Sequence, residues 1–276
     1  MSGVALTMMA FALPAVPASA VTIGQVPAVA QDACDVEPID LVQPTVTSGT
    51  SYVVPSSGGI AAWTVTSWST RTSPFPGQSM ALKMFRKVSD PVTYQVVGHD
   101  GPRALAPGLN SFPAHVVVKP GDVLGLNYVS GGSCAFQAPG EPILYNPGSL
   151  ADGGSAAFTP DTDFRVNESA ELTPTSDISF GKVKSNPNGT ATLPVNVPNP
   201  GQLKAKGNGV NASSAGAVSA TKVKSPGRVK LRIRARGKSA RKLADTGKVT
   251  LKAKIVFTPT GGIASTTKKK IKLHRA

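Results

Sequence analysis

The sequence is poor in the residues from which active sites are most often built. Its 276 residues include only three histidines and two cysteines, and aromatic residues make up 5%. Their spacing matches neither a His-Glu-x-x-His zinc motif nor the Gly-x-Ser-x-Gly turn of a serine hydrolase. We therefore expect a protein that is not an enzyme and that uses no cofactor.

Two of the histidines leave an unrecognised hydrolase open as an alternative, because the members of a catalytic triad meet in space rather than in sequence. His99 lies in the turn-forming run Gly-His-Asp-Gly-Pro at 98–102, and His115 lies in a β-rich run. A triad would require one of them beside a carboxylate and a hydroxyl. A loop histidine beside a β-turn is the simpler interpretation.

Acidic residues are almost absent from the last hundred residues. Residues 1–172 contain seven Lys and Arg against thirteen Asp and Glu, a net charge of −6. Residues 173–276 contain 22 Lys and Arg and only two acids, Asp177 and Asp245, a net charge of +20. Both tryptophans and all four tyrosines lie in the first part. This shift predicts a domain boundary, with a linker at 173–179.

Long apolar runs are missing after the N-terminus. Residues 3–16 are almost wholly apolar, and Pro-Ala-Ser-Ala at 17–20 supplies the small residues that signal peptidase requires. Residues 1–20 are therefore expected to be a signal peptide, although no Lys or Arg precedes the apolar run. No later run is long enough to span a membrane. We expect an extracellular protein, released or held at the cell wall, with residues 21–42 as an N-terminal segment.

The two cysteines, Cys34 and Cys134, fit an exported protein. An even number of cysteines in such a chain predicts a disulfide, which here would tie the start of the mature chain to a late strand of the first domain. Free or metal-binding thiols are the alternative. The sequence offers no further cysteine and no nearby histidine to complete a zinc site.

Helical periodicity is absent from the first domain, where strand signals are frequent, and residues 239–246 of the second domain can form one or two helical turns. Apolar and β-branched runs such as 60–68, 80–88 and 122–129 are separated by turns that contain Gly and Pro. Short strands at this spacing are typical of sandwiches and jelly rolls. We predict an all-β fold of two β-sandwich domains, the first jelly-roll-like at 43–172 and the second at 180–276.

In the second domain, apolar and basic residues alternate in two long runs, 229–236 and 248–257. Because successive side chains of a strand point to opposite faces, one face of each run enters a core and the other faces water. The sequence therefore predicts a cationic outer surface. Its expected members are Lys230, Arg232, Arg234, Arg236, Lys252, Lys254, Lys270 and Lys272.

The second domain resembles a known kind of module. The run at 189–203, Gly-Thr-Ala-Thr-Leu-Pro-Val-Asn-Val-Pro-Asn-Pro-Gly-Gln-Leu, looks like the opening of an Ig-like module that recurs at the C-termini of exported proteins of high-GC bacteria. The alternating strands and Phe-Thr-Pro-Thr-Gly-Gly at 257–262 are similar to its second half. The resemblance covers roughly 178–275. It implies an Ig-like sandwich with a non-catalytic accessory or spacer role, and it carries no site residues.

A surface of one charge sign attracts polyanions through interactions that salt weakens. Outside a cell, the expected partner is an anionic cell-wall polymer or polysaccharide. Specific nucleic-acid binding is not expected, because the sequence lacks a DNA-binding motif and no Tyr or Trp interleaves with the cations. Two alternatives stay open. The charge can serve only solubility and the protection of edge strands, or the basic domain can contact the acidic first domain.

Two other binding sites are candidates in the first domain. Trp63, Trp68 and Tyr128 are flat side chains of the kind that stack on sugars, which makes a carbohydrate-binding module an alternative function. The tryptophans are five residues apart, so a regular strand would place one in the core and the other outside. Asp161 and Asp163 offer oxygen ligands for Ca²⁺, against the simpler interpretation of a solvated acidic loop.

Overall fold

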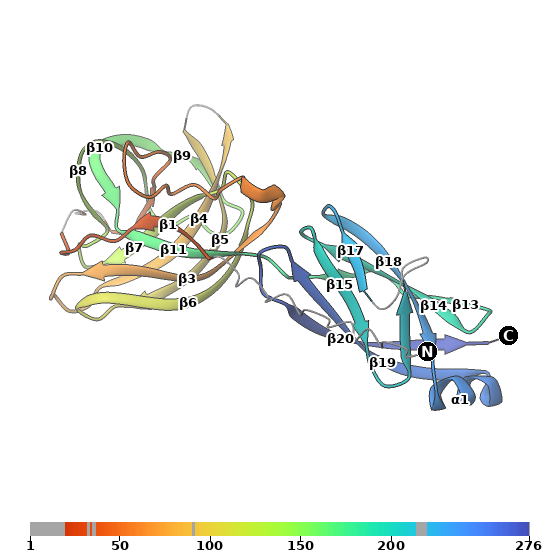
Figure 1. Ribbon diagram of the computed structural model, residues 1–276. Coiled ribbons are helices and arrows are strands. Elements are labelled where there is room, and N and C mark those ends of the chain that lie inside the picture. The colour runs from red at the N-terminus through yellow and green to blue at the C-terminus, as the bar shows by residue number, and fades with distance from the viewer. Residues whose placement is uncertain (1–19, 32–33, 35–36, 90–91, 214–219, 276) are drawn as a thin grey trace, which may run out of the picture.

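The computed structural model describes residues 20–31, 34, 37–89, 92–213 and 220–275, with the backbone alone at 211–213 and 220. The expected signal peptide therefore lies outside the described residues, apart from Ala20. The described chain is almost entirely β-structure in four antiparallel sheets, with one short α-helix (Figure 1), so the all-β prediction is confirmed. No helix within these residues has the length and apolar character needed to cross a bilayer.

Two sheets form the first half of the chain. Sheet 1 has the strand order β1–β11–β3–β6, and sheet 2 has the order β10–β8–β2–β7–β4–β5–β9. The strands of sheet 1 are β1 (Val21–Gln25), β3 (Trp63–Thr72), β6 (Gly108–Val118) and β11 (Glu168–Pro174). Those of sheet 2 are β2 (Ile39–Val42), β4 (Ser79–Ser89), β5 (Thr93–Ala104), β7 (Val123–Ser130), β8 (Ala135–Pro147), β9 (Ser155–Ala157) and β10 (Thr159–Val166). A single 3-10 turn, η1 (Ser57–Gly59), precedes β3.

Sheets 1 and 2 face each other across one apolar core. Val65 and Leu172 of sheet 1 belong to the same buried cluster as Leu124 and Leu126 of sheet 2. Alternation along each strand places these side chains between the sheets, as expected for a layer that is buried on one face. This half of the chain is therefore sandwich-like.

The segment at 21–42 is part of this sandwich, which corrects the expectation of a separate N-terminal segment. Strand β1 pairs with β11, and β2 is inserted between β7 and β8. These pairings join residues that are far apart in sequence, so a local pattern of apolar residues does not reveal them. The predicted disulfide between Cys34 and Cys134 is confirmed, with 6.0 Å between the two Cα atoms, and it fastens the same segment to the start of β8.

Two further sheets form the second half. Sheet 3 has the order β12–β14–β18–β16, with β13 also on β14, and sheet 4 has the order β17–β15–β19–β20. The strands of sheet 3 are β12 (Ser179–Phe180), β13 (Lys184–Asn186), β14 (Thr190–Val197), β16 (Val210–Ser213) and β18 (Gly227–Ala235). Those of sheet 4 are β15 (Gly201–Lys206), β17 (Ala220–Val223), β19 (Lys248–Pro259) and β20 (Ser265–His274). The helix α1 (Lys238–Thr246) connects β18 to β19 and ends at Gly247, which takes a left-handed φ of 67°.

The two alternating runs of the sequence form β18 and β19, which supply core residues to sheets 3 and 4. Leu231 and Ile233 of β18 are buried in the same cluster as Leu251 and Ile255 of β19. The basic residues between them are exposed. Sheets 3 and 4 thus share one core, and their outer faces carry the cations.

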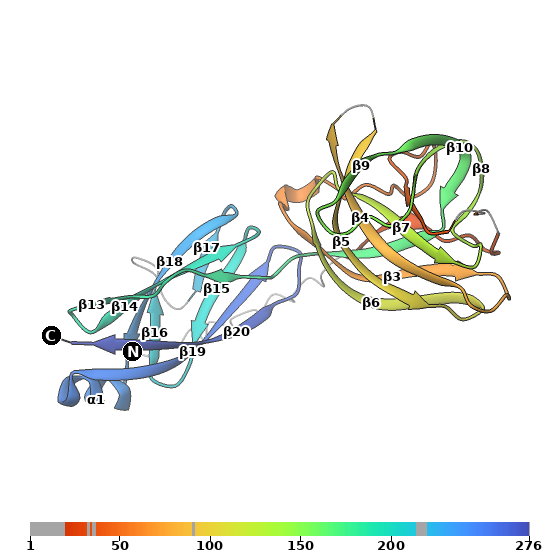
Figure 2. The same ribbon diagram turned by 180° about the vertical axis from the view of Figure 1, so that it is seen from behind.

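The first two sheets and the last two sheets form separate layered bodies joined by a short connection (Figure 2). Asn199 lies at this junction, and its side chain is completely buried. Its Oδ1 accepts hydrogen bonds from the backbone N–H groups of Ala61 and Ala62, at 2.9 and 3.0 Å. Its Nδ2 donates to the carbonyl oxygens of Ala62 and Thr175, at 2.8 and 2.9 Å. The side-chain amide thus accepts two hydrogen bonds and donates two. Asn199 thereby fixes the turn after β14 to the chain that leads into β3. Neutral hydrogen bonds of Asn199 therefore join the halves, and a contact of 2.9 Å between His115 Nε2 and Asp177 Oδ2 also crosses the junction.

Candidate functional site

Sheet 4 carries many lysines on its outer face, and seven exposed ones cluster on β19, β20 and the adjoining end of β15. The register of β19 and β20 places Lys252 opposite Lys270, and Lys254 lies between Lys268 on one side and Lys206 of β15 on the other. Residues paired in this way share a face of the sheet. All of these side chains are exposed. The lysine face is defined here as Lys206, Lys248, Lys252, Lys254, Lys268, Lys270 and Lys272.

A second row of cations follows β18 on the outer face of sheet 3. The arginine face is defined as Arg228, Lys230, Arg232 and Arg234, which are exposed and alternate with buried core residues. Their partners on β14 are uncharged, since Lys230 lies opposite Pro194 and Arg232 opposite Thr192. The charge of this face is therefore concentrated in one row on β18, with Lys184 of β13 opposite Thr192 on the same side, whereas the lysine face extends over three neighbouring strands.

The eight cations predicted from the sequence do not lie together. Four fall on or directly after β18, and four fall on the lysine face; these are Lys230, Arg232, Arg234 and Arg236 in the first group and Lys252, Lys254, Lys270 and Lys272 in the second. Sequence reasoning also missed Lys206, Lys248 and Lys268. Alternation marks them as outward-facing, but only the pairing of the strands shows that they join the lysine face.

The lysine face is hollowed in two places. One hollow of about 440 Å³ is bounded by Lys252, Lys254, Lys268 and Lys270. A second hollow of about 510 Å³ lies beside α1, where Lys242 and His274 add to the face. Neither hollow is lined by a carboxylate. Both therefore offer space in which anionic groups can lie between the lysine side chains.

Counter-charges are scarce around both faces. The second half contains Asp177, which lies 2.9 Å from His115 Nε2, and Asp245, which is exposed on α1. Among the ion pairs of the described residues, none involves a member of the lysine face or of the arginine face. Charges of one sign that lack partners raise the local potential and attract anions from solution.

The proposed sugar platform is wrong, because all three aromatic side chains are buried. Trp63 is 3% exposed, Trp68 1% and Tyr128 0%. A register shift between Val65 and Ser67 of β3 changes the alternation, so both tryptophans point into the core instead of to opposite faces. Their indole N–H groups donate to the carbonyl oxygen of Pro55 and to Asp100 Oδ2. Buried rings cannot stack on a sugar at the surface.

The two candidate histidines each contact a carboxylate on the surface. His99 Nδ1 lies 2.7 Å from Asp152 Oδ1, and His115 Nε2 pairs with Asp177. Within the part of the chain that is described, no hydrogen bond joins either histidine to a hydroxyl group. The three members of a hydrolase triad are therefore not assembled at either position.

The two candidate calcium ligands, Asp161 and Asp163, are both exposed on β10. Asp161 Oδ1 accepts the backbone N–H of Thr162 at 2.7 Å, and Asp163 Oδ1 accepts that of Gly140 at 2.6 Å. Among residues 20–275, apart from the undescribed positions, no group of three or more potential metal ligands comes together. Asp161 instead caps the adjacent backbone, and Asp163 links β10 to the neighbouring strand β8.

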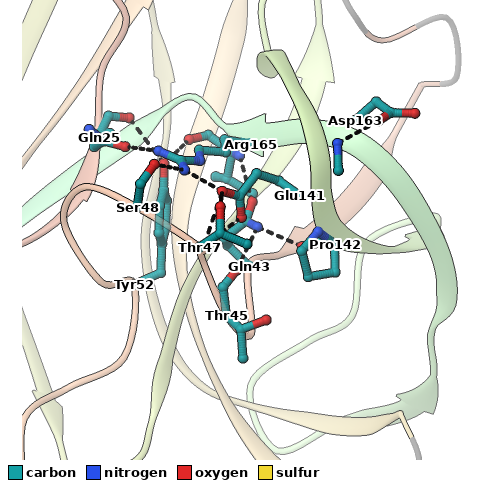
Figure 3. Close-up of polar contacts among 12 residues, drawn as sticks. Gln25, Gln43, Thr45, Thr47, Ser48, Tyr52, Glu141, Pro142, Asp163 and Arg165 are labelled. Atoms are coloured by element: carbon teal, nitrogen blue, oxygen red, sulfur yellow. Dashed lines mark hydrogen bonds and ion pairs between the residues drawn. The ribbon is translucent and has the colours of Figure 1, made fainter.

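A buried polar cluster that the sequence did not reveal lies between β8, β10 and the loop before η1 (Figure 3). The Arg165 guanidinium donates to Glu141, to Gln25 Oε1 at 2.5 Å and to Ser48 Oγ at 3.1 Å. Burial raises the pKa of Glu141, but hydrogen bonds from Thr47 and Arg165 outweigh it and lower that pKa below its ordinary value. The charges neutralise each other inside the fold, so this cluster is structural.

Comparison with known proteins adds no functional assignment. No family model matches the chain, and no curated protein matches it. Among solved structures, the Faecalibacterium prausnitzii beta-glucuronidase is similar over 95% of this chain, at 10% identity and a TM-score of 0.20. This chain spans about half (47%) of the length of that protein. Similarity at this level supports no statement about activity, so the two cationic faces define the candidate site.

Proposed function

We propose that this is a secreted, non-enzymatic extracellular or cell-surface protein whose basic C-terminal half binds anionic polymers of the cell wall or acidic polysaccharide. The lysine face carries the proposal, because its seven cations are exposed and none of them has an ion-pair partner among the described residues. The disulfide supports an oxidising compartment, where such bonds persist. In this proposal the first sandwich is jelly-roll-like and the second is Ig-like.

The spacing of the lysines suits a linear polymer. Residues two apart on a strand, such as Lys252 and Lys254, are roughly 6.6–6.8 Å apart along it, because a strand rises about 3.3–3.4 Å per residue. Lysine carries a compact charge on a flexible side chain, which meets anionic groups without demanding one geometry. Each contact releases counterions from the polymer, so affinity should fall steeply as salt rises.

A purely solubilising role for the charge makes a different prediction. Solubility depends on net charge, whatever the positions of the cations. Binding by the lysine face depends on where the charge lies. Variants with the same loss of charge at different positions therefore separate the two functions.

The test is elution of the full chain from immobilised heparin in a rising salt gradient. Replacement of Lys252, Lys254 and Lys270 by Gln should lower the salt concentration of elution well below that of the wild type. The matched control replaces Lys182, Lys238 and Arg241 by Gln, which removes the same charge from exposed positions outside the sheets. Equal shifts in both variants, or no retention of the wild type, would contradict the proposal.

A further inference from the structure

We infer that the basic half bridges two polyanion chains, one bound on the lysine face and the other on the arginine face. This inference rests on the proposed function and adds to it a second activity, the cross-linking of anionic polymers. It follows from the placement of two cationic faces on opposite sides of one sandwich.

The two faces point in opposite directions because sheets 3 and 4 share a core. Leu231 and Ile233, which alternate with the arginine face, are 2% and 0% exposed, and Leu251 and Ile255, which alternate with the lysine face, are 1% and 0% exposed. All four belong to one buried cluster. Packed sheets lie about 10 Å apart, and the cationic side chains extend outward from each. The charges of the two faces are therefore separated by the full thickness of the sandwich.

A single extended polymer lying on one face cannot also lie on the other. To do so it would have to reverse direction around an edge of the sandwich. One such edge is closed by β13 and β20, where Ser185 Oγ donates to the carbonyl oxygen of Lys272 at 3.0 Å. Each face is thus a separate binding surface, and occupation of one leaves the other free for a second chain.

The chemistry of the arginine face also suits an independent chain. Its four cations form one row on β18, and Arg234 lies six positions after Arg228, so the row is about 20 Å long at the usual rise of a strand. A guanidinium can donate two parallel hydrogen bonds to a sulfate, phosphate or carboxylate group. This row therefore fits one extended polyanion, whereas the lysine face offers a broader area of charge.

Bridging can be measured as capture of a second chain. Heparin is immobilised, the full-length protein is bound to it, and fluorescent heparin is added at increasing concentration. The wild type should capture fluorescent heparin. Capture should rise, reach a maximum and fall at high concentration, because excess polymer then occupies both faces of each molecule separately.

Variants with one face neutralised give the decisive comparison. One variant replaces Lys252, Lys254, Lys268 and Lys270 by Gln, and the other replaces Arg228, Lys230, Arg232 and Arg234 by Gln. Each should still be retained by immobilised heparin at low salt but should capture about tenfold less of the second chain, since simultaneous engagement is lost. Circular dichroism checks that both variants are folded, and the Lys182, Lys238 and Arg241 control should capture like the wild type.

The outcomes distinguish this inference from the proposed function. Wild-type protein that is retained but captures no second chain contradicts bridging alone. Full capture by either one-face variant also contradicts it, because a dimer or a single face would then be sufficient. Failure of the wild type to bind immobilised heparin contradicts the proposed function and bridging together.

Discussion

Glu168 lies in an environment that is unfavourable to a charge. Its side chain is completely buried on β11, and neither carboxylate oxygen has a hydrogen-bond partner. Burial, together with the nearby negative charge of Asp100, raises the pKa of Glu168 well above its ordinary value. Asp100 is itself held by Trp68 and Arg103. The core of the folded protein therefore favours the neutral form of this carboxylic acid.

This carboxyl group should make stability depend on pH. The folded state keeps the proton above the ordinary glutamate pKa of about 4.3, whereas the unfolded chain loses it there. The free energy of unfolding should therefore fall as pH rises above the ordinary glutamate pKa, because the unfolded chain releases this proton before the folded protein does. Urea unfolding of Glu168→Gln at several pH values should show this slope removed. Glu171→Gln, whose carboxylate accepts a hydrogen bond from Thr22 at the surface, is the control and should keep it.

The Arg165–Glu141 pair should be costly to break from one side only. Both side chains are buried, so Glu141→Leu leaves a guanidinium without its anion and should destabilise the protein by about 3–5 kcal/mol. Replacing Arg165 by Met in the same chain removes the stranded charge and should recover much of the loss. Chemical denaturation measures both variants. Equal destabilisation of the single and double variants would show that the ion pair itself, and not the stranded charge, dominates.

At the scale of elements, alternation was the strongest signal in the sequence. It predicts which residues of β18 and β19 enter the core and which face water, because the period of two depends only on the strand itself. It fails on β3, where a register shift between Val65 and Ser67 turns Trp68 inward. The sequence around Val65 offers no Gly or Pro to mark that irregularity.

Pairing between distant strands could not be predicted. Strand β2 lies between β7 and β8, and β1 completes an edge of sheet 1, although both come from a segment expected to lie before the first domain. Partner choice depends on the packing of the whole sandwich. The buried ion pair of Arg165 and Glu141 forms only through that packing. The sequence alone therefore did not predict that these two residues meet.

The turn that contains Asn199 should control how firmly the two halves are joined. Asn199→Ala removes the acceptor for two backbone N–H groups, and each unsatisfied buried group costs about 1–3 kcal/mol. We expect a lower unfolding temperature and faster proteolytic cleavage of the chain at 175–178. Asn196→Ala is the control, since that exposed side chain bonds only to Ser179 Oγ. Identical cleavage rates in the two variants would contradict a fastening role for Asn199.

On the scale of the whole molecule, the sequence separates acidic from basic residues, and the fold then separates the basic residues into two groups. Composition alone separates a mildly acidic first part from a strongly basic second part. The fold then distributes the cations of the second part between two opposite faces, because the two alternating runs belong to different sheets. A linear sequence cannot show this second division, since β18 and β19 follow each other along the chain with only α1 between them.

The central claim is that the lysine face binds polyanions through charge, and the salt dependence of affinity tests it most directly. The dissociation constant of the full chain for heparin is measured across a series of salt concentrations. The plot of log affinity against log salt should be linear and steep, and the Lys252, Lys254 and Lys270 to Gln variant should flatten it by about two to three, at about 0.7–0.9 for each lost contact. An affinity that does not change with salt, or a variant with the slope of the wild type, would contradict the account.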